Sequence, residues 1–151
     1  MRLYYRLAFL LAFGLIFLAL ARADNGEVLK LVIDGPIHPL VEERVDRAVQ
    51  EAQKSHAEAL LIEMRTPGGL MSSMENIIHK ILSSPVPVII YVTPSGSGAA
   101  SAGFFILESA DVAAMAPGTN TGAAHPVRGD GAAMDPVMKE KIENYAASLM
   151  R

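Results

Sequence analysis

Cysteine is absent from this 151-residue sequence. Its absence excludes a disulfide framework, a thiolate nucleophile and a cysteine-ligated metal site. The four histidines offer no pair at metal-ligand spacing, so we expect neither a metal nor any other cofactor. An exported domain without disulfides must depend on its apolar core, and a domain near this size can bury roughly two-thirds of its unfolded surface.

An excess of basic residues is also missing. The chain has 13 lysines and arginines against 16 aspartates and glutamates, a net charge of −3. Nucleic-acid binding requires a basic patch or stripe, so we expect no nucleic-acid partner. There is no internal repeat and no long polar linker, and the length favours one small domain.

The first 23 residues have the layout of a secretory signal peptide. Arg2 and Arg6 precede an unbroken apolar run over residues 7–21, and a small-x-small site, residues 21–23, follows before Asp24. The run has 15 residues, shorter than the roughly 20 that a membrane-spanning helix needs. We therefore predict cleavage and a periplasmic or other extracytoplasmic location, with an uncleaved N-terminal anchor as the alternative.

The remaining chain alternates between apolar runs and stretches with helical periodicity. This order predicts an α/β fold with mostly parallel strands covered by helices. The expected strands are residues 28–33, 59–64, 86–92 and 112–115. The expected helices have apolar stripes from Leu40 to Ala52 and from Met74 to Leu82, and two more span 99–109 and 137–150. Residues 117–136 are rich in glycine, alanine and proline, which indicates a mobile loop.

Two loops follow strands of this predicted sheet, where parallel α/β sheets bind their ligands. In the first, TPGG at 66–69, two glycines allow close approach of a substrate, and the N–H of Gly69 at a helix start could serve an oxyanion hole. In the second, GAASAG at 98–103, only small residues flank Ser101, and the N–H of Ala102 could be a second donor. Taken alone, the first loop is better explained as an ordinary strand-to-helix turn, and the second as a small-residue helix start with Ser101 as its cap.

A base for Ser101 is harder to assign from the residues. Lys141 lies in the last predicted helix and could act as a base only if its ammonium lost its water. His125, in a glycine- and alanine-rich loop, is the competitor. The other histidines, at 38, 56 and 79, neighbour charged or polar helix surfaces, and we interpret them as solvated.

Taken together, TPGG at 66–69, PSGSGAASAG at 94–103 and APGTNTGAAHP at 116–126 resemble the NfeD-type membrane-bound serine proteases of the Clp-protease class. The resemblance implies a Clp/crotonase-like fold and a Ser–Lys dyad of Ser101 and Lys141, because KIENY at 141–145 is similar to the family's lysine segment. Lys139 is the alternative base if the match to the family's lysine segment is shifted by two residues. The implied oxyanion donors are Gly69 and Ala102, with Gly68 as their neighbour.

The resemblance further implies what the protein does. It predicts a serine endopeptidase, residues 24–151, that cleaves apolar segments of membrane-associated proteins, including a stomatin-like membrane protein, and is itself membrane-associated. Family members continue beyond the point that corresponds to Arg151, so we expect this domain to be C-terminally incomplete. The oligomeric state stays open, a homo-oligomer included.

Four alternatives compete with this hypothesis. One is a Ser–His peptidase that uses His125, as soluble Clp proteases use a loop histidine. A second is a truncated remnant without activity that binds peptides or partners. An acyl-CoA enzyme of crotonase type does not fit export or the serine nucleophile. An α/β-hydrolase needs an acid and then a histidine after the serine, and His125 follows Ser101 too closely for that order.

Overall fold

The computed structural model describes residues 26–125, 127 and 133–149. The signal peptide predicted at 1–23 lies outside the described residues. Four parallel strands form the main sheet in the order β1-β2-β3-β5. Their bounds are β1 (Val28–Asp34), β2 (Ala59–Arg65), β3 (Val88–Val92) and β5 (Val112–Met115). The predicted α/β class with parallel strands is therefore confirmed.

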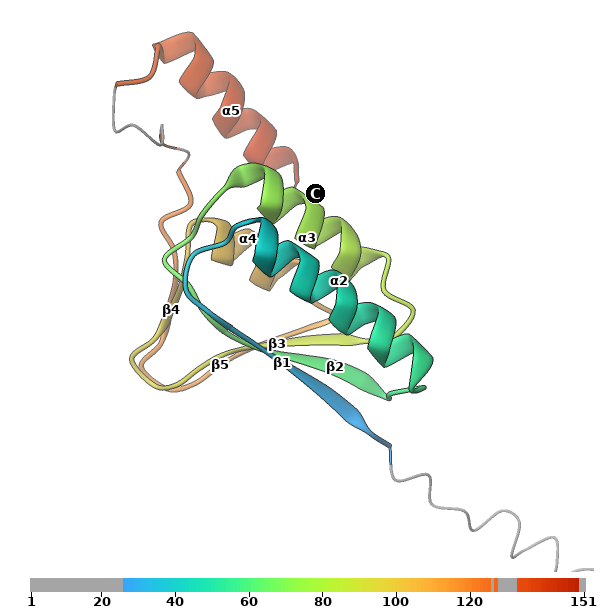
Figure 1. Cartoon of the computed structure of the whole chain (residues 1–151). Coiled ribbons are helices and arrows are strands. Elements are labelled where there is room, and N and C mark those ends of the chain that lie inside the picture. Colours follow the sequence, from blue (N-terminus) through green and yellow to red (C-terminus); the bar gives the residue numbers. More distant parts are fainter. Residues whose placement is uncertain (1–25, 126, 128–132, 150–151) are drawn as a thin grey trace, which may run out of the picture.

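Three helices connect these strands and cover one face of the sheet (Figure 1). They are α2 (Pro39–Lys54), α3 (Met71–Leu82) and α4 (Ala102–Glu108). Helix α2 buries a stripe at helical spacing, Val41, Val45, Val49 and Ala52, as the sequence predicts. The ends of the predicted stripes are wrong, because Leu40 is 65% exposed and Leu82 is 69% exposed; the adjacent residues Val41 and Ile81 occupy the buried face instead.

The core lies between this helical layer and the sheet. Strand β1 alternates between buried or half-buried and exposed residues, whereas β2 and β3 are more deeply buried because each has a strand on either side. Fully buried side chains from both layers meet there, among them Leu60, Ile62, Ile77, Ile90 and Ile106.

A second, two-stranded parallel sheet was not predicted. It pairs β4 (Gly98–Ala100) with β6 (Asn120–Gly122). The helix expected from residue 99 therefore begins only at Ala102, and the loop expected over 117–136 contains a strand. Alanine favours helix by itself, but here the backbone of β4 is held by tertiary pairing, which overrides that propensity.

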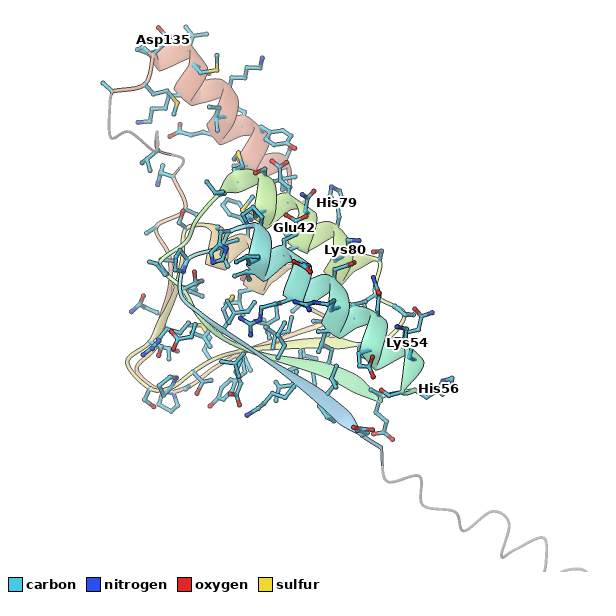
Figure 2. All side chains as sticks on the ribbon, in the orientation of Figure 1. Glu42, Lys54, His56, His79, Lys80 and Asp135 are labelled. Carbon is cyan, nitrogen blue, oxygen red and sulfur yellow. The ribbon has the colours of Figure 1, made fainter. Side chains whose placement is uncertain are left out.

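The last described element is α5 (Pro136–Ser148), close to the predicted helix. Asp135 caps it by accepting hydrogen bonds from the N–H groups of Val137 and Met138 at 3.0 and 3.1 Å. Ala146 is its one buried residue among those described. Figure 1 shows α5 extending away from the other helices, with Asp135 at its distant end in Figure 2. Within the described ranges, no helix combines the length and the apolar character needed to cross a membrane.

Candidate active site

The two loops singled out in the sequence lie side by side beyond the carboxyl ends of the main strands. Thr66 pairs with Ala99 of β4: its N–H donates to Gly98 O at 2.9 Å, and Ala100 N–H donates to Thr66 O at 3.0 Å. Because the side chain of Thr66 is buried, this link is shielded from water. The pairing brings the glycines of the first loop to the serine of the second.

Ser101 has an unusual backbone conformation, with φ 52° and ψ −117°. A non-glycine residue in so sparsely populated a region carries a strain of about 1–3 kcal/mol, which surrounding contacts must hold in place. Those contacts are hydrogen bonds from Ser101 N–H to Gly122 O at 2.7 Å and from Phe104 N–H to Ser101 O at 3.0 Å. The side chain forms no helix-capping hydrogen bond, so the hydroxyl is not occupied as a cap.

Gly68 is the immediate neighbour of this serine. Its φ of +110° suits glycine, and a Cβ added here would lie 2.6 Å from the Cβ of Ser101 and 3.1 Å from its Oγ. No side chain fits between the two backbones. Gly68 N–H is itself directed to Thr66 Oγ1 at 3.1 Å, so Gly68 shapes the site without offering a free donor.

Gly69 is held against the segment that follows β1. Ile37 N–H donates to Gly68 O at 2.8 Å, and Leu70 N–H donates to Ile37 O at 2.9 Å. A Cβ on Gly69 would lie 2.1 Å from Ile37 O, so a side chain is excluded. The N–H of Gly69 has no hydrogen-bond partner within the described part of the chain.

The sequence predicted a free N–H because Gly69 was expected at the start of a helix, but the structure gives a different reason. Helix α3 begins at Met71, with Leu70 as its N-cap, so Gly69 is not at a helix start. In the parallel bridge between Ile37 and Gly69, the neighbours of Gly69 make the hydrogen bonds. The glycine's own N–H is left for another acceptor.

Ala102 supplies the second free donor. It is the first residue of α4, where helical N–H groups have no partner within the helix. Neither backbone nor side-chain atoms of the described residues accept from it. Gly69 and Ala102, which line the same pocket as Ser101, thus each have an N–H without a partner among the described residues, and backbone N–H donors are the groups that stabilise an oxyanion in acyl transfer.

Ser101, Gly69 and Ala102 line one pocket with a volume of about 550 Å³. Apart from His38, the remaining lining side chains are apolar: Pro36, Ile37, Leu70, Met71, Met74, Phe105, Ala124, Val127, Met134 and Ile142. The side chains around the serine therefore favour an apolar partner.

The candidate bases lie outside this lining. Lys141 is exposed on α5, adjacent to Ile142, which does line the pocket. Lys139 is exposed on the same helix and lies 3.9 Å from Glu143 in an ion pair. His125 is exposed and lines a separate hollow with Phe104 and Phe105. The structure therefore brings together the serine and both predicted donors, and leaves the base at the margin.

His38 was not among the site residues predicted from the sequence. It is half-buried and lines the pocket of Ser101, so its interpretation as a solvated residue is wrong. Its place directly after Ile37 was the available signal, because a loop that follows a parallel strand faces the ligand side of the sheet. The two other histidines of helix surfaces are exposed as expected, and Figure 2 shows His56 just beyond α2 and His79 on α3.

The two residues with shifted pKa values, Asp34 and Arg65, do not line the pocket of Ser101. The Arg65 guanidinium donates to both carboxylate oxygens of Asp34 at 2.8 and 2.6 Å, and this hydrogen bonding lowers the pKa of Asp34. The same contact raises the pKa of Arg65. No group of three or more acidic or histidine side chains within the described ranges is arranged to hold a metal ion.

Solved structures define the class of this fold and site. The 1510-N membrane-bound stomatin-specific protease from Pyrococcus horikoshii, with a lysine replaced by alanine and a substrate peptide bound, superposes with a TM-score of 0.75 at 37% identity. That match covers 83% of this chain and 60% of the other. A serine-to-alanine mutant of the protease gives a TM-score of 0.74 at 37% identity, over 82% of this chain and 62% of the other.

A more distant structure shows the fold alone. ClpP1 from Listeria monocytogenes is 19% identical and superposes with a TM-score of 0.65 over 80% of this chain and 69% of the other. The fold is that of a ClpP-like protease domain.

The family follows from the sequence relatives. Residues 27–151 match the family described as NfeD1b, N-terminal domain. The chain is 44% identical over 115 residues to the membrane-bound protease PH1510 of Pyrococcus horikoshii and 34% identical over 115 residues to the membrane protein NfeD1b of Bacillus subtilis. Each match covers 76% of this chain, which spans only 26% of the relative. The chain belongs to the NfeD1b N-terminal domain family.

Proposed function

We propose that this chain is a serine endopeptidase in which Ser101 attacks the peptide carbonyl and Lys141 is the base. The observation that supports it most is the strained Ser101 flanked by two unoccupied N–H groups in an apolar pocket. The relatives named as proteases, one solved with a serine and one with a lysine replaced by alanine, support the same chemistry.

The reaction runs through an acyl-enzyme. Neutral Lys141 takes the proton of the Ser101 hydroxyl as Oγ forms a bond to the carbonyl carbon. The carbonyl oxygen becomes an oxyanion that accepts from the N–H groups of Gly69 and Ala102. As the C–N bond breaks, the lysine returns the proton to the leaving amine, and a water molecule then hydrolyses the ester by the same route.

Lys141 requires a change before it can act. Its side chain is exposed, and water favours the charged ammonium. Its neighbour Ile142 lines the pocket, so a peptide in the pocket lies close to this turn of α5 and can cover the lysine. Removing water from an amine favours its neutral form, which couples substrate binding to activation of the base.

The pocket favours an apolar substrate segment. Three of its lining residues are methionines, Met71, Met74 and Met134, whose unbranched side chains adapt to differently shaped apolar groups. Because one relative is named a stomatin-specific protease, we propose a stomatin-like membrane protein as the natural substrate.

The dyad is tested with a quenched peptide whose central residues are leucine, valine and phenylalanine. Ser101→Ala and Lys141→Ala should each lower kcat/KM by roughly 10⁴-fold or more, and the double variant should be no worse than either, because the residues act as a unit.

Two matched controls make this test specific. Lys139→Ala removes a lysine from the same helix and should leave turnover within about twofold of wild type, as for a surface change. His125→Ala should also be mild. An active Lys141→Ala variant together with an inactive His125→Ala variant would replace the lysine by the histidine, and equal background rates for every variant would identify an inactive peptide-binding domain.

We also propose that residues 1–23 direct the domain out of the cytoplasm, where it works at the membrane. The support is the basic start, the apolar run and the small-x-small site in the sequence, together with two relatives named as membrane proteins. N-terminal sequencing of the secreted fraction should begin at Asp24. A mature chain that still begins at Met1 would identify an anchor instead.

A further inference from the structure

His38 has a place in the pocket that the proposed dyad does not use. It follows Ile37 at the end of the β1 segment and lines the pocket that contains Ser101, Gly69 and Ala102. Except for the Ser101 hydroxyl, the other lining side chains are apolar or absent. His38 is thus the one ionisable side chain among the described lining residues.

The backbone around His38 is fixed, but its side chain is unengaged. Ile37 is bonded on both sides to the Gly68–Leu70 segment, and His38 O accepts from Val41 N–H at 2.9 Å and from Glu42 N–H at 3.2 Å. The imidazole forms no hydrogen bond to any other described residue and does not cap α2. The loop therefore fixes the backbone from which the imidazole projects, and the ring nitrogens have no hydrogen-bond partner among the described residues.

No charged side chain of the described residues on the surrounding elements pairs with the imidazole. On α2, Glu42 accepts from Asn76 Nδ2 of α3 at 3.0 Å, and Glu75 of α3 is not part of the lining. On α5, Glu143 faces Lys139 at 3.9 Å, and Lys141 is exposed. Among the described lining residues near Ser101 and Ala124, Ser101, Ala102, Phe105 and Ala124 are uncharged.

We infer that His38 determines specificity by binding a carboxylate of the substrate, an aspartate or glutamate side chain next to the apolar segment. This inference rests on the proposed function, since it assigns a subsite of the same pocket. A histidine side chain becomes positively charged in mildly acidic solution, and a charge-assisted hydrogen bond is roughly twice as strong as a neutral one. A lysine or arginine of the substrate would find no acid in the described lining and would be repelled by the imidazolium.

Two peptide series test this. Both carry the same leucine-, valine- and phenylalanine-containing core, and a glutamate or a glutamine is placed in turn at each of the three positions on either side. For the best position, the kcat/KM ratio of the glutamate to the glutamine peptide should be roughly tenfold at about pH 5.5 and should approach one at about pH 8.5. Titration of the dyad cancels in this ratio, because both peptides use the same enzyme.

Variants assign the preference to His38. His38→Gln should bring the ratio to about one at both pH values, since glutamine keeps a polar side chain without the titrating charge. His79→Gln, on the exposed surface of α3, should keep the wild-type ratio. Circular dichroism and urea unfolding check that both variants are folded. A pH-dependent ratio that persists in His38→Gln overturns the assignment.

A binding measurement separates this inference from the proposed proteolysis. Fluorescence anisotropy of the labelled peptides with the Ser101→Ala variant should show the same glutamate preference at acidic pH without turnover. Equal affinities for the two peptides, or no binding of either, overturn the role of His38. A retained preference in a wild-type protein that cleaves neither peptide would instead overturn the proteolytic function and leave the carboxylate subsite standing.

Discussion

Ser101 and Lys141 lie in two regions of the molecule that are held very differently. The serine follows β4, whose backbone is bonded to Thr66 on one side and to β6 on the other. The lysine is exposed on α5, where Ala146 is the buried residue. The backbone around Ser101 is therefore held by hydrogen bonds from other segments, whereas the position of Lys141 depends on how α5 packs. This difference teaches that the two halves of one proposed dyad should respond differently to mutation.

The largest effect is expected where the nucleophile is most tightly confined. Gly68→Ala places a Cβ 2.6 Å from Ser101 Cβ and should lower kcat/KM a hundredfold to a thousandfold, the range for displaced nucleophiles and oxyanion donors. Gly35→Ala is the matched control, because its φ of +128° is equally unfavourable for alanine but no atom lies within 4 Å of the new Cβ. Equal losses in the two variants would show that backbone strain, and not the contact with Ser101, is responsible.

The next largest difference between the two regions should be the stability lost when a side chain is shortened in α4 or in α5. Ile106 of α4 is fully buried, so Ile106→Ala should lower the free energy of unfolding by about 2–5 kcal/mol. Val137 of α5 is 75% exposed, and Val137→Ala should change it by less than about 0.5 kcal/mol. Urea unfolding followed by circular dichroism measures both. Similar losses would contradict the view that α5 is loosely attached.

Detaching α5 should affect catalysis more than stability. Ala146 is 3% exposed, so Ala146→Glu cannot keep its carboxylate in place and should undock the helix from the hollow around Phe104 and Phe105. Misplacement of Lys141 should then lower kcat/KM roughly a hundredfold. Ser148→Glu, at an exposed position of the same helix that does not line this hollow, is the control. Full activity of Ala146→Glu would remove α5 from the mechanism.

The smallest effect concerns the exposed ion pair between β1 and β2. Arg65 lowers the pKa of Asp34, so the pair stabilises the folded state above the ordinary aspartate value of 3.8, and this contribution disappears as the pH falls through the lower folded pKa. Asp34→Asn should therefore shift the urea midpoint slightly downward at about pH 6, and this difference should close in acid below the ordinary aspartate range. Glu43→Gln, which removes the looser 3.9 Å pair with Arg47, should show no such pH dependence. A difference between Asp34→Asn and wild type that persists in strong acid would exclude the ion pair as its cause.

The sequence was most informative where local pattern and tertiary environment agree. The four apolar runs became the four parallel strands, and the stripe from Val41 to Ala52 became the buried face of α2. It was least informative for β4 and β6, because alanine, glycine and asparagine carry no strand signal, and only the pairing with Thr66 and with each other makes them strands.

In the candidate site, too, some residues could be predicted from the local sequence pattern and others only from the tertiary structure. The small residues around Ser101 and the paired glycines at 68 and 69 were sufficient to single out from the sequence two loops that the structure places side by side. His38 was missed because it was grouped with the histidines of polar helix surfaces, whereas the pocket that it lines is formed with side chains far along the chain, such as Met74 and Ile142.

The sequence by itself determined the alternation of strands and helices, the absence of cysteine chemistry, and the small side chains without which Ser101 could not be approached. These properties depend on residue type and spacing along the chain, so they can be read before folding. Tertiary structure decided the rest: the φ of 52° at Ser101, the freedom of the Gly69 N–H, and the place of His38 in the pocket. Each of these arises from contacts between segments far apart in the chain, such as Ile37 with Gly69 and Thr66 with Ala99, which no local pattern specifies.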